Sequence, residues 1–316
     1  MKCLIVQPMH EDGYALLRSK GVEPILCPSP DVETMVRMIP GCDAVITRDA
    51  GFPAAAFAAA AGLQIVVVHG TGHDAVDKEA AAAKGVLVAN TPRANARSVA
   101  ELTLGLALAL GRGIPAADRA ERSGRPNFRE SASFHELDGK TALVVGWGAI
   151  GGQFGRMADS AFGMNVLVHS PNAPDLNGFE RVASLESGLA EADFVTLHTP
   201  MRPETRHMMN AERFAAMKPG AFLINVARAG LVDETALLGA LESGHLGGAA
   251  LDVYSPEAPM GPLAKFPNVI FTPHLGATTE EALSRVALGA AGHVLTALAG
   301  RLPDTTLNPE IRRTPA

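Results

Sequence analysis

The chain has 316 residues, of which 47% are hydrophobic and 19% charged, and its formal net charge is −6. This composition is typical of a globular protein that is long enough for two domains with separate cores. A negative net charge without a basic cluster argues against a nucleic-acid partner. No stretch reaches the roughly 18 apolar residues of a membrane span, and the apolar start of the chain is too short for a signal peptide.

The three cysteines, Cys3, Cys27 and Cys42, lie in mostly apolar or turn-like surroundings. An odd number of cysteines without metal-type spacing indicates reduced thiols. We therefore expect a cytoplasmic protein with no membrane partner and no metal site.

Residues 1–90 alternate between strand-like and helix-like segments, which predicts a parallel sheet with helices on both faces. The strand-like segments are residues 3–6, 24–27, 44–46, 65–68 and 86–89, and the helix-like segments are residues 14–19, 32–38, 53–61 and 78–83. The loop Gly70-Thr71-Gly72 follows the fourth of these strands. Ligands bind at the carboxyl ends of parallel strands, so this loop is a candidate site for a small anion.

An apolar helical pattern over residues 98–112 and a polar excursion over residues 124–138 precede a glycine-rich stretch. There an apolar run ends in Gly146, Gly148 and Gly151, spaced as Gly-x-Gly-x-x-Gly, and a helical pattern follows. The glycines permit a tight turn, the approach of a pyrophosphate and the packing of helix on strand. The helix N-terminus offers N–H groups to the phosphates. The stretch predicts a dinucleotide site, the alternative being a glycine-rich turn that binds nothing.

The next strand, residues 163–169, ends where dinucleotide-binding domains commonly carry an acidic residue for the adenosine ribose. Here the sequence reads His169-Ser170-Pro171-Asn172, with neither a carboxylate nor an adjacent arginine. Without the carboxylate a 2′-phosphate is not repelled, and without an arginine nothing attracts it strongly. The choice between NAD and NADP therefore stays open.

Further strand-like segments at residues 194–197, 221–225, 248–252 and 269–272 bring the second domain to about six parallel strands, a full dinucleotide-binding fold. Helices are expected near residues 211–217 and 234–243. A last helix, about residues 280–299, is expected to return to the N-terminal unit.

Three of these strands are followed by a titratable residue, namely Arg228, Glu257 and His274. Reduction of a carbonyl by hydride needs a cation to polarise the C=O, an acid to protonate the alkoxide, and a carboxylate that keeps this acid charged. Each residue alone would more often be an ordinary ion pair, solvated group or hydrogen-bonding partner. Their shared place downstream of the glycine turn favours catalysis.

These segments resemble the D-isomer-specific 2-hydroxyacid dehydrogenases, the family of phosphoglycerate dehydrogenases and glyoxylate/hydroxypyruvate reductases. The resemblance covers nearly the whole chain and rests on residues 68–77, 94–101, 225–234, 247–257 and 272–279 together with the glycine turn. It implies an α/β protein with two doubly wound parallel-sheet domains. A Rossmann cofactor domain, residues 98–284, would be inserted in a flavodoxin-like substrate domain, residues 1–97 and 285–316.

By this resemblance His274 would donate the proton in reduction and accept it in oxidation, and Glu257 would hydrogen-bond to it. Arg228 would hold the substrate carboxylate and keto oxygen, backbone N–H groups of Thr71 and Gly72 would bind the carboxylate, and Arg48 would be a further substrate contact. The cofactor contacts that carry over, besides the three glycines, are Thr103, Ala149, Ile150, Ser170, Thr199, Val226, Ala227, Asp252 and Gly276.

The chain departs from the family pattern at three positions. Ala149 replaces a frequent arginine near the pyrophosphate, Ala229 replaces a usual glycine after Arg228, and Ser170 replaces the usual aspartate. The chain ends soon after Glu310, so we expect it to lack the regulatory extension of longer phosphoglycerate dehydrogenases.

We therefore expect an oxidoreductase, a homodimer by analogy with the family, that transfers a hydride between NAD(P)H and a small D-2-hydroxy or 2-keto acid. Glyoxylate or hydroxypyruvate is the favoured substrate, because no basic cluster indicates a phosphorylated one. The alternatives are phosphoglycerate dehydrogenase-type activity and a non-catalytic NAD(H)-sensing protein of the corepressor type. Formate and phosphite dehydrogenases fit less well, since the former lack a glutamate at position 257 and the latter have a lysine at position 71.

Overall fold

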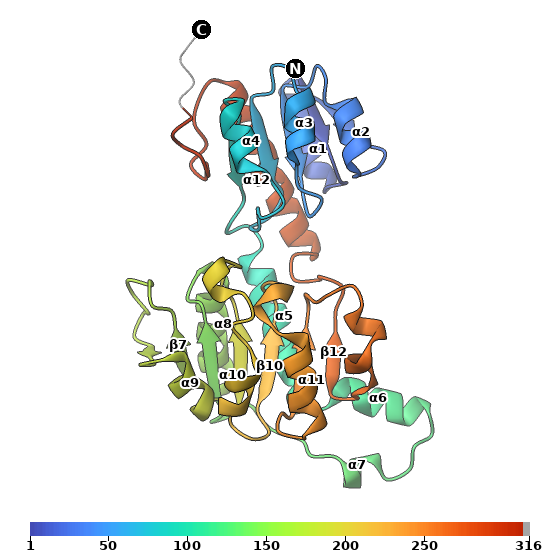
Figure 1. Ribbon diagram of the computed structural model, residues 1–316, viewed down its shortest axis with the longest axis vertical. Coiled ribbons are helices and arrows are strands. Elements are labelled where there is room, and N and C mark those ends of the chain that lie inside the picture. The colour runs from blue at the N-terminus through green and yellow to red at the C-terminus, as the bar shows by residue number, and fades with distance from the viewer. Residues whose placement is uncertain (312–316) are drawn as a thin grey trace. The chain divides into compact units, whose positions relative to one another are not determined.

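The computed structural model describes residues 1–311, which form two compact units (Figure 1). Unit 1 consists of Met1–Asn95 and the chain from Ala277 onward, and unit 2 of Ala96–Gly276. Unit 2 is therefore an insertion in the sequence of unit 1. The domain limits expected from the sequence, 97/98 and 284/285, lie near these changeovers and stay a prediction.

Unit 1 is built on a five-stranded parallel sheet in the order β2-β1-β3-β4-β5, the flavodoxin-like order. Its strands are β1 (Lys2–Ile5), β2 (Glu23–Leu26), β3 (Ala44–Thr47), β4 (Ile65–Val68) and β5 (Leu87–Asn90). Its helices are α1 (Glu11–Ser19), α2 (Val32–Met38), α3 (Ala54–Ala59), α4 (Lys78–Ala83) and α12 (Glu280–Leu298). Because both faces are covered, a central strand such as β4, with sequence IVVV, is apolar throughout.

The two faces of this sheet are covered by different helices. On one face α2, α3 and α4 pack through Met35, Phe57 and Ala81. On the other face α1 and α12 pack, and α12 contributes Ala290 and Val294 to the core. The last helix thus completes the core of the N-terminal sheet, as the sequence analysis expected.

Unit 2 is built on a seven-stranded parallel sheet in the order β12-β11-β10-β9-β6-β7-β8, with helices on both faces. Its strands are β6 (Thr141–Val145), β7 (Asn165–His169), β8 (Glu180–Arg181), β9 (Phe194–Leu197), β10 (Phe222–Asn225), β11 (Gly248–Leu251) and β12 (Val269–Phe271). Its α-helices are α5 (Ala96–Gly111), α6 (Ile114–Arg122), α7 (Phe128–Ser131), α8 (Ala149–Phe162), α9 (Leu185–Glu191), α10 (Ala211–Ala216) and α11 (Glu234–Glu242). Short 3-10 turns are η1 (Pro203–Thr205), η2 (Ala229–Leu231), η3 (Ala258–Met260) and η4 (Pro262–Lys265).

The strand order of unit 2 is that of a dinucleotide-binding fold, with one strand more than the expected six. The additional strand is β8, which pairs with β7 through Leu167 with Glu180 and Val168 with Arg181. Two exposed, charged residues carry no apolar pattern, so β8 could not be recognised from the sequence. Helices α5 and α8 cover one face of the sheet, and α9, α10 and α11 cover the other.

No single helix within residues 1–311 is long and apolar enough to cross a membrane. Helices α5 and α6 pass that test only as a pair, and a bend of 56° separates them. Leu106, Ala107 and Leu110 of α5 are buried in the core of unit 2.

Candidate active site

The glycine turn lies between β6 and α8, where the strand order of unit 2 reverses. Gly146 has φ of 103°, and a Cβ at this position would lie 2.8 Å from the backbone of His198. At Gly151 a Cβ would lie 2.1 Å from the Gly146 carbonyl oxygen. At Gly148 a Cβ would meet no described atom within 4 Å. Two of the glycines therefore let the chain pack on itself, whereas the third leaves open space.

That open space lies at the N-terminus of α8. Gly148 is the N-cap residue and gives the helix no side-chain hydrogen bond, while Gly148 and Ala149 are exposed and Ile150 is half-buried. Uncapped N–H groups at a helix N-terminus bind phosphate well, and the missing side chain lets a pyrophosphate approach. The residues of the turn fit a dinucleotide.

Trp147 ties this turn to the segment that precedes β8. Its ring lies 5.1 Å from that of Phe179 between ring centroids. On α8 a Cβ at Gly155 would lie 2.6 Å from the indole, so only a residue without a side chain fits at this position. The indole therefore packs between α8 and the segment that leads into β8.

The end of β7 carries an arginine after all, because β8 brings Arg181 beside it. The guanidinium donates through Nη1 to the Ser170 carbonyl oxygen and through Nη2 to the Ala173 carbonyl oxygen, the latter at 2.5 Å. The sequence analysis considered only chain neighbours of Ser170, and it missed this residue because the contact is made 11 residues along the chain.

The turn after β10 holds Arg228. Asn225, the last residue of β10, is fully buried, and its side chain accepts from the Ala227 N–H at 3.0 Å and donates to the Arg228 carbonyl oxygen at 2.9 Å. The Arg228 guanidinium is half-buried and donates through Nη1 to the Ala227 carbonyl oxygen at 2.6 Å. Asn225 therefore fixes the turn that contains the predicted cofactor contacts Val226 and Ala227.

The loop after β12 is organised by Asp252, which follows β11 and is 2% exposed. Its carboxylate accepts from the Thr272 hydroxyl at 2.5 Å, the Leu275 N–H at 2.7 Å and the Gly276 N–H at 3.0 Å. Its backbone carbonyl oxygen accepts from the His274 N–H at 3.1 Å. A buried carboxylate needs such donors, and here they all come from the loop that carries His274.

His274 has an unusual backbone conformation. Its φ is 55°, in the left-handed region that costs a residue other than glycine on the order of 1–3 kcal/mol. The bonds to Asp252 offset this cost and hold the exposed imidazole on a fixed loop. Strained residues that are held in this way cluster at functional sites.

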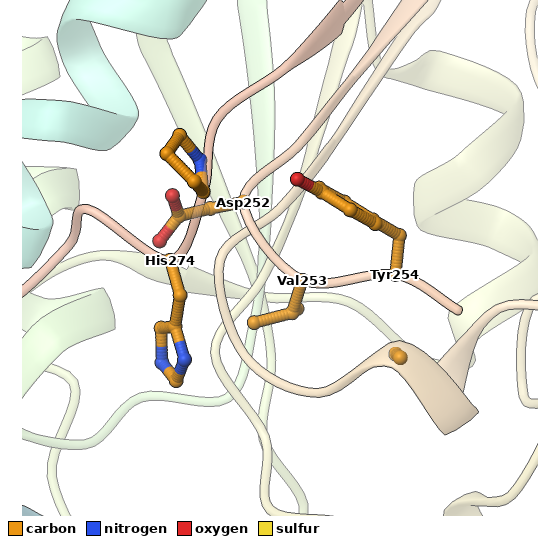
Figure 2. Close-up of a pocket in the computed structure, with 6 residues that line it drawn as sticks. Asp252, Val253, Tyr254 and His274 are labelled. Carbon is orange, nitrogen blue, oxygen red and sulfur yellow. The ribbon is translucent and has the colours of Figure 1, made fainter. Parts of the chain in front are cut away.

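His274 lines a cavity of about 330 Å³ in unit 2 (Figure 2). The other lining residues are Ala229, Asp252, Val253, Tyr254 and Pro273. Of the three predicted catalytic residues, His274 lines this cavity, and Ala229 in its lining directly follows Arg228 in the chain. Glu257 is exposed at the N-terminus of η3 and does not line this cavity.

The segment between Tyr254 and Glu257 is anchored by a residue that the sequence analysis did not single out. Glu234, at the start of α11, accepts from the Ser255 N–H at 2.7 Å and from its hydroxyl at 2.5 Å. A bidentate carboxylate fixes both the backbone and the side chain of Ser255. The signal for this role was only the glutamate in the first turn of a predicted helix.

In unit 1 the predicted substrate contacts follow β3 and β4. Arg48 is half-buried and donates to the Pro8 carbonyl oxygen at 3.2 Å, while the Thr71 hydroxyl donates to the Pro92 carbonyl oxygen at 3.2 Å. His69 directly follows β4 and is buried, whereas Thr71 and Gly72, further along the same loop, are half-buried. Burial, and secondly the charge of Arg48, lower the pKa of His69 to about 4. The substrate-binding roles stay predictions.

Two cofactor candidates, Thr103 and Thr199, differ in exposure. Thr103 is fully buried in α5, and its hydroxyl donates to the Val99 carbonyl oxygen at 2.8 Å, whereas Thr199 is half-buried after β9.

Next to Thr199, both ring nitrogens of His198 are buried without a hydrogen-bond partner among the described residues. Burial lowers the pKa of His198 to about 3, so the ring is neutral and packs on Phe154 at 5.7 Å.

Within residues 1–311 no three His, Cys, Asp or Glu side chains are grouped so that they could hold a metal ion. The three cysteines are unpaired and buried, and burial raises the pKa of each thiol. Buried thiols of this kind are unreactive.

Comparison with known proteins places these features in a family. Residues 104–276 match the model of the NAD binding domain of D-isomer specific 2-hydroxyacid dehydrogenases. The chain is 38% identical over 314 residues to a D-3-phosphoglycerate dehydrogenase of Methanocaldococcus jannaschii, covering 98% of this chain and 59% of that protein. The chain thus spans little more than half the length of this curated relative.

Solved structures match over nearly the whole chain. A protein of Thermus thermophilus is 35% identical with a TM-score of 0.89, covering 97% of this chain and 100% of the other. An NADPH-dependent glyoxylate/hydroxypyruvate reductase of Sinorhizobium meliloti, in complex with NADP and malonate, is 28% identical with a TM-score of 0.86. That match covers 100% of this chain and 99% of the other.

Proposed function

The chain belongs to the D-isomer specific 2-hydroxyacid dehydrogenase family, and on this basis we propose that it interconverts a small D-2-hydroxy acid and its 2-keto acid with NAD(P). The observation that supports this most directly is the cavity lined both by His274 and by the turn after Arg228. It lies in the same unit as a glycine turn that fits a dinucleotide.

When bound, a nicotinamide dinucleotide supplies the hydride for reduction or accepts it in oxidation. The residues of the chain must bind the substrate anion and move one proton. His274 is suited to the proton transfer, because its imidazole is exposed at the cavity while its backbone is held by Asp252. In reduction it donates a proton to the oxygen that becomes the hydroxyl, and in oxidation it takes that proton back.

Arg228 is suited to hold the substrate. A guanidinium binds a carboxylate through two N–H groups and polarises a neighbouring carbonyl. Its Nη1 bond to the Ala227 carbonyl and the clamp from Asn225 restrict where the group can point. Glu257, as partner of His274, belongs to the proposal, and the Glu234–Ser255 bonds anchor the segment before it.

For the substrate we propose D-3-phosphoglycerate first and glyoxylate or hydroxypyruvate second. The relative that is 38% identical is named D-3-phosphoglycerate dehydrogenase, and the reductase of glyoxylate and hydroxypyruvate is 28% identical. The higher identity puts D-3-phosphoglycerate first. The earlier preference for glyoxylate, drawn from the lack of a basic cluster, is not confirmed. A homodimer and a cytoplasmic location are carried over from the family resemblance and complete the proposal.

The test is an assay of nicotinamide absorbance with NAD(H) and NADP(H), using D-3-phosphoglycerate, glyoxylate and hydroxypyruvate in turn. We expect turnover with at least one acid, and a loss of about 10²- to 10³-fold in kcat/KM in Arg228→Gln, since one donor to the developing charge is removed. Arg122→Gln, an exposed and ion-paired residue of α6, is the control and should leave turnover unchanged. Dinucleotide binding without turnover on any acid would favour the NAD(H)-sensing alternative.

A further inference from the structure

The choice between NAD and NADP depends on the end of β7, where a dinucleotide-binding fold meets the adenosine ribose. An NAD site places a carboxylate there for the ribose hydroxyls, and Ser170 cannot serve as one. The acidic residue on the following loop, Asp175, is held by its own turn, since its two oxygens accept from the N–H and side-chain amide of Asn177 at 2.7 and 2.8 Å. The end of β7 itself, residues 169–172, therefore carries no carboxylate of the kind that selects NAD.

Arg181 supplies the opposite charge at the same position. Its guanidinium is held over residues 170–173 by two neutral carbonyl oxygens, and a guanidinium has more N–H donors than these two bonds use. Within the part of the chain that the structure describes, Arg181 forms no ion pair. Its charge is thus fixed in place without a carboxylate to neutralise it.

The nearby cation Arg213 already has a partner. Arg213 pairs with Glu186 at 2.9 Å and also donates to a backbone carbonyl. His169, the last residue of β7, has a lowered pKa, and burial is the main cause. The charge of Glu186 raises this pKa, whereas the charges of Arg213 and Arg181 lower it further. A neutral imidazole adds no charge at pH 7, so Arg181 is the cation that an incoming anion would meet.

From this arrangement we infer that Arg181 binds the 2′-phosphate of NADP(H), so that the chain prefers NADP(H) to NAD(H). The inference rests on the proposed dinucleotide function and adds the cofactor that this function uses. The dianionic phosphate pairs with the guanidinium fork, and the Ser170 hydroxyl on the same loop offers a further donor.

Binding can be followed through Trp147, the single tryptophan of the chain. It lies in the glycine turn and packs on Phe179, which directly precedes β8. Its emission therefore reports on both the pyrophosphate turn and the strand that carries Arg181. Titration with NADPH and NADH separately, with calorimetry in parallel, measures both affinities without any substrate acid.

We expect the wild-type chain to bind NADPH at least about 10-fold more tightly than NADH. In Arg181→Gln the affinity for NADPH should fall on the order of 10- to 100-fold, the size of a lost charge-assisted bond, while that for NADH stays within about 2-fold. Arg181→Lys keeps the charge but loses the fork, so it should lie between the two. Arg122→Gln again is the matched control, and a melting curve checks that each variant is folded.

Three outcomes would overturn the inference. Tighter binding of NADH by the wild type would show that the strand end selects the ribose hydroxyls. An equal loss for both dinucleotides in Arg181→Gln would show that the residue only braces residues 170–173. If neither dinucleotide changes the emission or releases heat, the dinucleotide function itself fails along with the preference, whereas the first two outcomes leave that function intact.

Discussion

Units 1 and 2 share a plan, since each has a parallel sheet buried on both faces and each has a glycine turn after a strand. In unit 2 the turn follows β6 at the strand-order reversal, and Gly148 directly precedes α8. In unit 1 Gly70-Thr71-Gly72 follows β4, one strand away from the reversal, and α4 begins only at Lys78. The same local sequence type thus gives a helix N-terminus for phosphates in one unit and only loop N–H groups in the other.

A second contrast concerns the buried asparagine that ends a strand in each unit. Asn90 of β5 donates to the Thr71 carbonyl oxygen at 2.8 Å and so holds the loop of the neighbouring strand. Asn225 of β10 holds its own loop, through Ala227 and Arg228. Similar sheets therefore differ in function through the loops at their carboxyl ends and through the buried polar residues that fix those loops.

The strongest way to sharpen the contrast is to remove the proton-transfer group of unit 2 without changing its fold. In His274→Asn we expect kcat to fall about 10²- to 10⁴-fold, the usual contribution of a positioned acid or base. Asparagine tolerates the left-handed conformation at φ of 55°, so the loop bonds to Asp252 should persist. Steady-state kinetics measure the loss, and unchanged quenching of Trp147 by the dinucleotide is the control. Near-normal kcat would remove His274 from the mechanism.

A pair of substitutions separates the two uses of glycine within the unit 2 turn. Gly151→Ala places a Cβ 2.1 Å from a carbonyl oxygen, and such overpacking costs about 3 kcal/mol, which lowers Tm by roughly 6–12 °C. Gly148→Ala meets no described atom, so its Tm should stay unchanged while dinucleotide affinity falls about 10-fold or more. Calorimetric melting and the emission titration measure the two effects. A normal affinity in Gly148→Ala would mean that the pyrophosphate binds elsewhere.

The smallest effect concerns the buried histidines, one in each unit. Burial lowers the pKa of His69 to about 4 and of His198 to about 3, whereas both are near 6.5 in the unfolded chain. As the pH falls below about 6.5 the unfolded state takes up these protons and the folded state does not, so stability is lost by up to about 1.4 kcal/mol per pH unit for each histidine. This loss continues down to the folded pKa.

Denaturant unfolding at pH 7, 6 and 5 (about the range in which a free histidine titrates) measures the slope of the free energy of unfolding against pH. In His198→Phe this slope should become smaller for unit 2 and stay the same for unit 1. The fold should persist, since phenylalanine can keep the contact with Phe154. An unchanged slope for unit 2 in this variant would show that burial does not keep His198 neutral, and the lack of any slope for unit 1 would show the same for His69.

Much of the fold followed from periodicity, but several site residues did not. The β6 turn and the succession of strands and helices along the chain are encoded in runs of apolar residues and in glycine spacing, which are local signals. The doubly wound order of the two sheets was expected from the family resemblance. Arg181 and Glu234 act through contacts 11 and 21 residues along the chain. Such contacts depend on strand register and helix placement, which single-sequence patterns do not specify. The position of Glu257 outside the cavity lining depends on η3, a turn too short to leave a pattern.

The place of α12 in the first core has a consequence for biosynthesis. The residues of unit 2 are consecutive and can fold as soon as they emerge from the ribosome. The sheet face formed by Ile5, Ile46 and Val67 is covered in part by Ala290 and Val294, which are translated after unit 2. Until then the nascent N-terminal sheet exposes an apolar surface, which makes it the part of the chain that would most need a chaperone during translation.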